Sequence, residues 1–170
     1  MIQYLYLIFL TLLALAAEAL LRSAGFYLPL TAFAVFYAAC IGGILPGVAF
    51  ALVAGFLLDS FFGYSFTISA LLYLLILPIV WGLKDQYVEP GSVLIQMAVG
   101  AILVLLVLLP PIPVQGGWRV TLDLLPMLFL SSLFSALLLP LYIIWADHVA
   151  ERLVLRTYAV DFRQRRRQHG

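Results

Sequence analysis

Apolar runs follow one another along almost the whole chain, and this feature limits the possible folds more than any other. The runs cover residues 2–21, 28–45, 46–62, 66–83, 92–109 and 126–145. About 20 apolar residues in a helix cross the hydrocarbon core of a bilayer, and a helix satisfies its own backbone hydrogen bonds where water is absent. The runs therefore predict an all-α integral membrane protein with six transmembrane helices. Five spans are the alternative if the second and third runs, which are short, are partly re-entrant.

The composition agrees with this fold class. Of the 170 residues, 65% are hydrophobic and 10% are charged, whereas about 25% of the residues of a soluble domain are charged. We assign residues 1–146 to a six-span membrane domain and residues 147–170 to a short tail that is first amphipathic and then basic. The only cysteine, Cys40, lies in an apolar run and is most simply a small buried side chain.

Proline and glycine divide the runs from one another. Pro29 and Pro46 each fit the first turn of a helix, where the missing N–H removes no hydrogen bond. Gly42 and Gly43 separate the second run from the third, so we expect a very short link there. The sequence PPIP at residues 110–113 ends the fifth run, because proline cannot continue a helix.

The basic residues predict the orientation of the chain. Six spans put both termini on the same side of the membrane. With the tail in the cytoplasm, seven of the nine Lys and Arg residues are cytoplasmic, and only Arg22 and Arg119 are outside. The positive-inside rule therefore places both termini in the cytoplasm.

Four of the cytoplasmic residues end the tail: Arg163, Arg165, Arg166 and Arg167. Anionic lipid headgroups attract such a cluster by about 1 kcal/mol per basic residue. We interpret it as a lipid-surface contact, in preference to a specific protein or nucleic-acid site.

Small residues recur at every fourth position between residues 43 and 67. They are Gly43, Gly47, Ala51, Gly55, Gly63 and Thr67, with Asp59 in the same register. Residues four apart lie on one face of a helix, and small residues are typical of close helix contacts in membranes. We predict that Gly47, Ala51, Gly55, Asp59 and Gly63 form a helix-packing or partner-binding surface.

Two acidic residues within or beside the runs need an explanation. A carboxylate is costly in a bilayer and usually faces a partner or water inside the protein, which we expect for Asp59. The alternative is that the helix ends near Leu58 and leaves Asp59 as a solvated loop residue. Glu18 and Arg22 are four residues apart, a spacing that favours a side-chain pair. We interpret them as a structural pair at the membrane interface and not as a substrate site.

The sequence lacks the motifs by which membrane enzymes are recognised. It contains no H-E-x-x-H or G-x-S-x-G motif, and its two histidines, His148 and His169, both follow the last run. We therefore expect no enzymatic activity and no metal or other cofactor. A transported solute needs several convergent polar groups. The hydroxyl and amide side chains of the runs are scattered, and we interpret them as packing residues: Thr11, Ser69, Gln96, Ser131, Ser132 and Ser135.

The third and fourth runs resemble the MreD family of rod shape-determining proteins, small bacterial inner-membrane proteins with a glycine-rich helix, a Leu-Asp pair and a glycine four residues later. The matching residues are Gly55, Leu58, Asp59 and Gly63, within GVAFALVAGFLLDSFFG. The length of the chain, the number of runs and the basic tail also fit. The chain departs from the family at Ala51 and Thr67, where family members often have glycine.

The resemblance implies a noncatalytic scaffold in the bacterial cytoplasmic (inner) membrane that serves cell elongation, peptidoglycan synthesis and rod shape. Its implied direct partner is MreC, a single-span protein with a large periplasmic domain. MreB and the RodA synthase with its penicillin-binding transpeptidase are implied further partners. The MreD fold is also similar to that of the substrate-binding subunits of energy-coupling-factor transporters. The alternative function is therefore that of a membrane subunit that binds a vitamin or another small solute.

Overall fold

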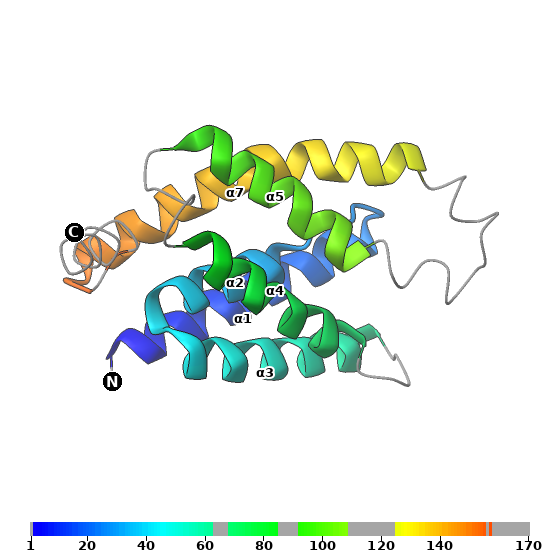
Figure 1. The fold of residues 1–170 in the computed structure, drawn as a ribbon. Coiled ribbons are helices and arrows are strands. Elements are labelled where there is room, and N and C mark those ends of the chain that lie inside the picture. Colours follow the sequence, from blue (N-terminus) through cyan, green and yellow to red (C-terminus); the bar gives the residue numbers. More distant parts are fainter. Residues whose placement is uncertain (1, 63–67, 85–91, 109–124, 156, 158–170) are drawn as a thin grey trace.

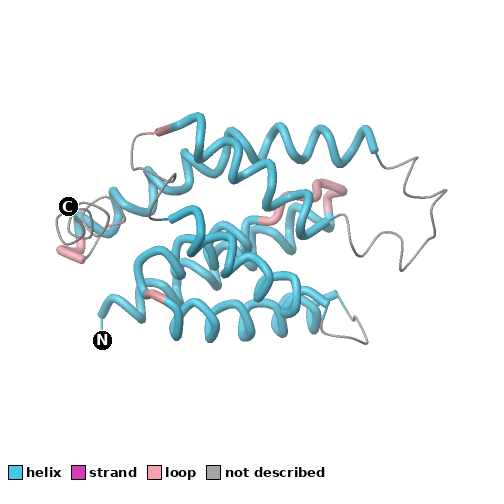
Figure 2. Tube along the Cα trace, viewed as in Figure 1, coloured by secondary structure: helices cyan, strands magenta, loops and turns pink. Residues whose placement is uncertain are grey.

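The computed structural model describes residues 2–62, 68–84, 92–108, 125–155 and 157, and these residues are helical apart from short loops and turns, with no strand among them (Figure 2). The helices are α1 (Ile2–Ser23), α2 (Leu30–Gly42), α3 (Ile44–Phe62), α4 (Ile68–Lys84), α5 (Val93–Leu108) and α7 (Leu125–Arg152). The all-α prediction is confirmed for this part of the chain. Three segments are long and apolar enough to cross a membrane: Ile2–Ser23, Leu45–Phe62 and Leu125–Arg152.

The helix ends follow the glycine and proline signals of the sequence. A single residue, Gly43, joins α2 to α3, and its φ of 84° is a backbone conformation that residues with a Cβ rarely adopt. Pro46 lies in the first turn of α3, where no hydrogen bond is lost. The last helix, α7, continues past Ala146 to Arg152, so the start of the predicted tail is helical.

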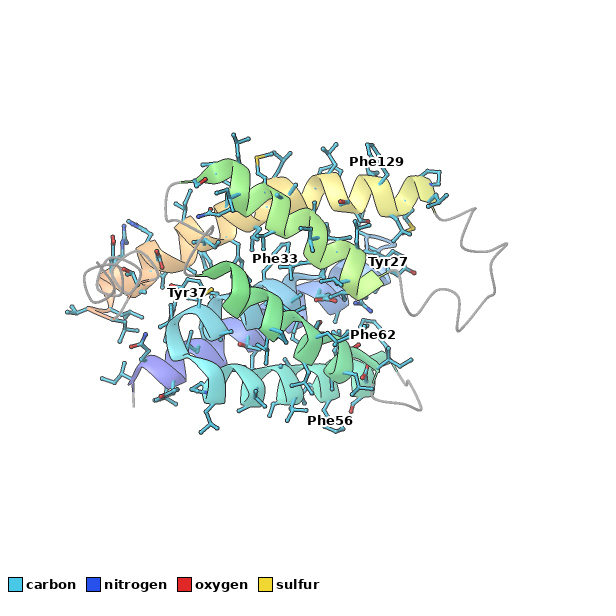
Figure 3. The ribbon with its side chains drawn as sticks, viewed as in Figure 1. Tyr27, Phe33, Tyr37, Phe56, Phe62 and Phe129 are labelled. Carbon is cyan, nitrogen blue, oxygen red and sulfur yellow. The ribbon has the colours of Figure 1, made fainter. Side chains whose placement is uncertain are left out.

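Helix α2 is the centre of the fold. Every residue from 31 to 41 is buried, and α2 contacts α1, α3, α4, α5 and α7. A helix that is apolar and covered on all sides is a core helix. Two of its large side chains, Phe33 and Tyr37, are buried inside the bundle (Figure 3).

Two groups of helices surround this centre (Figure 1). Helices α1, α3 and α4 pack on α2, and α3 also packs on α1 and on α4, whereas α5 and α7 pack chiefly on each other. A Cβ atom at Gly100 of α5 would lie 2.5 Å from the backbone oxygen of Ser135 in α7. The absence of a side chain at Gly100 therefore allows the backbones of α5 and α7 to approach closely.

The start of α1 and the end of α7 lie at the same end of the bundle. The Tyr6 hydroxyl donates a hydrogen bond to the backbone oxygen of Ala146 (2.7 Å), and the Tyr37 hydroxyl donates to Oδ1 of Asp147 (2.7 Å). We call the end of the bundle where Tyr6 and Tyr37 make these hydrogen bonds the tyrosine end. Successive described helices run in alternate directions (Figure 1).

Apolar side chains cover the outside of the bundle, and several polar side chains lie inside it. Phe56 on α3 and Phe129 on α7 point outward and are 51% and 73% exposed (Figure 3). The buried polar residues are Thr11, Glu18, Thr31, Asp59, Ser69, Gln96, Ser131, Ser135 and Thr157. Lipid tolerates an apolar exterior of this extent and water does not. Together with the three long apolar helices, it indicates a membrane protein.

Candidate functional site

The small-residue face of α3 packs against helices of the same chain. A Cβ atom at Gly47 would lie 3.0 Å from the Cβ of Ala39 in α2, and Ala51 is fully buried. A Cβ atom at Gly55 would lie 2.3 Å from the Cα of Ala70 in α4. These positions therefore hold α3 against α2 and α4, and a partner helix has no access to them in this arrangement. Gly63 lies outside the described residues.

Asp59 caps the beginning of α4. Its side chain is 2% exposed, and its Oδ2 accepts a hydrogen bond from the backbone N–H of Ser69 (3.0 Å). The first N–H groups of a helix have no partner within the helix, and a carboxylate there also interacts favourably with the helix dipole. Helix α3 continues beyond Leu58 to Phe62. The alternative interpretation of Asp59 as a solvated loop residue is therefore wrong.

Glu18 caps the beginning of α2 in the same way. Its carboxylate is fully buried, with Oε1 paired to Nη2 of Arg22 and Oε2 accepting a hydrogen bond from the backbone N–H of Thr31 (2.8 Å). Pro29 precedes α2, and no side chain caps this helix locally. The pair with Arg22 matches the sequence prediction, but Glu18 lies inside the bundle and has a second partner that the spacing did not indicate.

The two capping carboxylates belong to one group of buried side chains. We define the buried polar cluster as Glu18, Arg22, Thr31, Asp59, Ser69 and Tyr73, which come from α1, α2, α3 and α4. The fully buried Tyr73 lies within electrostatic range of Glu18, Arg22, Thr31 and Asp59. Of the hydroxyl and amide side chains that we expected to be scattered, only Ser69 belongs to this cluster, whose members from different helices the sequence did not group together.

The surroundings of Arg22 connect the cluster to the edge of the bundle. Its side chain is 10% exposed. Its guanidinium carbon lies 4.8 Å from the centre of the Phe62 ring, a distance at which the ring attracts the positive charge. Arg22 therefore contacts both the buried carboxylate of Glu18 and the aromatic end of α3.

Several polar atoms of the cluster have no hydrogen-bond partner among the described residues. They are Nε of Arg22, Oγ1 of Thr31, Oδ1 of Asp59 and the hydroxyl of Tyr73. The Thr31 side chain lies close to both the Tyr73 hydroxyl and the Glu18 carboxylate, although neither contact of its hydroxyl reaches hydrogen-bond geometry. The cluster therefore combines satisfied helix caps with unused donors and acceptors. No group of three His, Cys, Asp or Glu side chains suited to a metal ion occurs in the described part of the chain.

Sequence reasoning identified Asp59, Glu18 and Arg22 but missed Thr31 and Tyr73. The proline before α2 could have indicated the role of Glu18, because Pro29 has no side chain that can cap the helix and the first N–H groups of α2 therefore need an acceptor from elsewhere in the chain. No pattern pointed to Tyr73, which lies in an apolar run like its neighbours. The predicted lipid-contact residues Arg163, Arg165, Arg166 and Arg167 lie outside the described residues.

Comparisons with protein-family models, curated proteins and solved structures found no match.

Replacing Gly55 should separate α3 from α4. In Gly55→Leu the new Cβ meets backbone atoms of Ala70, at 2.3 Å for Cα and 2.4 Å for N. The helix backbone cannot rotate away as a side chain can. We expect a loss of about 1–3 kcal/mol in the free energy of unfolding, measured by denaturant unfolding in detergent. Phe56→Leu, on the exposed side of the same helix, is the matched control and should change little.

Removing the Asp59 carboxylate should weaken the start of α4. Asp59→Ala leaves the Ser69 N–H without its acceptor, and loss of a cap costs about 0.5–2 kcal/mol. Asp59→Asn keeps an acceptor oxygen and should cost less. The neighbouring Ser60→Ala is the control, because the exposed Ser60 hydroxyl donates to the Phe56 backbone oxygen of its own helix. An unfolding free energy equal to that of wild type in Asp59→Ala would exclude the capping role.

Proposed function

We propose that this chain is a noncatalytic membrane scaffold of the MreD type, which serves the cell-elongation and peptidoglycan-synthesis machinery in the bacterial inner membrane. The observation that carries the proposal is the structural role of two residues of the family motif, Gly55 and Asp59. Gly55 lets the backbones of α3 and α4 approach closely, and Asp59 caps α4 from inside the bundle. The motif behind the resemblance is thus part of the framework of the fold.

The apolar exterior supports a protein that acts by binding other membrane helices. Because the small-residue face is covered by α2 and α4, we place the contact with MreC on outward faces of the long helices. Phe9 on α1, Phe56 on α3 and Phe129 on α7 are exposed representatives of these faces. MreB and RodA with its transpeptidase join the assembly directly or through MreC.

Crosslinking in cells tests the scaffold function. A photocrosslinking residue placed at Phe9, Phe56 or Phe129 should capture MreC from at least one position, because these side chains are exposed. The inward Leu58, with 0% exposure, is the control position and should capture nothing. Deletion of the gene should also convert rod-shaped cells into rounded ones. No MreC adduct from any outward position, together with normal rods, would reject the scaffold.

The orientation of the chain is part of the same proposal. We propose six spans, both termini in the cytoplasm, and contact of the basic tail with anionic lipid. The shared location of the start of α1 and the end of α7 supports an even number of crossings. The buried polar cluster then lies at the outer side of the membrane and the tyrosine end at the cytoplasmic side.

Reporter fusions test the orientation. A reporter after Gly170 should give a cytoplasmic signal, and one inserted near Gly116, outside the described residues, should give an external signal. The expectation follows from the distribution of seven cytoplasmic and two external basic residues. A cytoplasmic signal near Gly116 would reject six spans in this orientation.

The buried polar cluster favours a second candidate function. A membrane subunit that binds a vitamin or another small solute needs several convergent polar groups, and the cluster brings polar side chains of four helices together. Mass spectrometry of protein purified in detergent separates the two functions. A stoichiometric small molecule without MreC would support the solute-binding subunit, and MreC without such a molecule would support the scaffold.

A further inference from the structure

The end of α7 is a tight turn around Val154. The N–H of Val154 donates a hydrogen bond to the backbone oxygen of Glu151 (3.0 Å), and the N–H of Leu155 donates to that of Ala150 (2.9 Å). This pair of bonds is the Schellman motif, in which the first residue after the helix takes the left-handed conformation and the chain turns back. Val154 is that residue, with a φ of 56°.

Valine is an unfavourable residue for this position. The end of α1 makes the same pair of bonds, and there the left-handed residue is Gly25, with a φ of 85°. Glycine adopts this conformation without strain because it has no Cβ, whereas a β-branched residue rarely adopts it. Among the described residues, Val154 is the only one besides glycine with a positive φ. Backbone strain that a fold retains points to a role for the strained residue.

The side chains at this turn are apolar and point away from the bundle. Leu153 is 53% exposed, and Val154 is 93% exposed, more than any other large apolar side chain among the described residues. The chain then returns to the bundle, because Leu155 packs against the core and Thr157 is 1% exposed. The turn therefore presents two apolar side chains from a backbone that is held on both sides.

The length of α7 places the turn at the level of the lipid headgroups. At 1.5 Å per residue, the 28 residues of α7 are about 42 Å long, and a bilayer with both headgroup regions is about 40–45 Å thick. The start of α1 indicates the same level. Tyr6 bonds to Ala146 near the end of α7, and the apolar Ile2, which is 67% exposed, lies one turn further out (Figure 1). Apolar side chains at this level can enter the boundary between headgroups and acyl chains.

We propose that the turn after α7 anchors the tyrosine end of the protein in the membrane interface. The side chains of Leu153 and Val154 insert into lipid, and the exposed Arg152 beside them contacts the lipid phosphates. Lipid is the occupant because α7 reaches the headgroup level at this turn and its outer face is apolar up to Ile144, which is 61% exposed. Insertion also gives the strained valine a role that glycine could not fill. The proposal goes beyond the scaffold function and holds for either side of the membrane.

Fluorescence quenching in phospholipid vesicles tests the position of the turn. The full-length Val154→Cys protein is labelled with bimane, and the only native cysteine, Cys40, is fully buried. Phospholipid with a nitroxide near the headgroup end of its acyl chain should quench this label more strongly than aqueous iodide does. A label at Leu58→Cys, a buried position, is the control and should be quenched by neither. Quenching at residue 154 by iodide alone would place the turn in water, and quenching by neither would show that protein covers it; either result would overturn the proposal.

Substitutions of Val154 connect the insertion to its side chain, with the bimane label moved to Leu153→Cys. Val154→Gly fits the left-handed backbone and removes the side chain, and Val154→Asn places a polar side chain that tolerates this conformation. Both should lose quenching by the lipid nitroxide, whereas the matched Val154→Ile should keep it. Because glycine suits the turn, a loss in Val154→Gly cannot be attributed to unfolding of the turn. Undiminished lipid quenching in Val154→Gly and Val154→Asn would overturn the role of Val154.

Discussion

Two buried carboxylates hold the first turns of α2 and α4, and much of the bundle depends on these contacts. An unpaired backbone N–H is expensive in a medium without water, and the proline before α2 provides no local cap. Glu18 and Asp59 provide the missing acceptors from the preceding helices, at 2.8 and 3.0 Å. Each contact joins a pair of consecutive helices at the same end of the bundle. This repetition brings the two carboxylates together with Arg22 and Tyr73.

Close backbone contacts complete the framework. In lipid, helices gain little from burying apolar surface, so their association depends on close packing and polar contacts. Gly47 and Gly55 allow α2 and α4 to approach α3, and Gly100 allows α7 to approach α5. Helix α2 becomes the core because α1, α3 and α4 pack around it and the α5 and α7 pair covers the remaining side. The tyrosine end then connects α7 to α1 and α2 through two hydroxyl hydrogen bonds.

The structure separates the surfaces on which the proposed activities depend. A scaffold would use the exposed apolar faces, represented by Phe9, Phe56 and Phe129. A solute site would use the buried polar cluster. A substitution on an outward face and one in the cluster can therefore affect partner binding and ligand binding independently. Gly55 and Asp59 would support either proposed activity only indirectly, through their contacts within the framework.

The sequence alone indicated a helical membrane protein and most of its helix ends, because apolar runs, glycines and prolines act locally. Only the tertiary structure decided which run is central, since the runs are alike and lipid is as apolar as leucine. It also decided that Asp59 bonds to Ser69 and that Glu18 reaches Thr31, thirteen residues away. The packing of α4 against the other helices likewise placed Tyr73 in the cluster. Spacing along one helix predicts neighbours within that helix, whereas contacts between helices depend on how their faces pack.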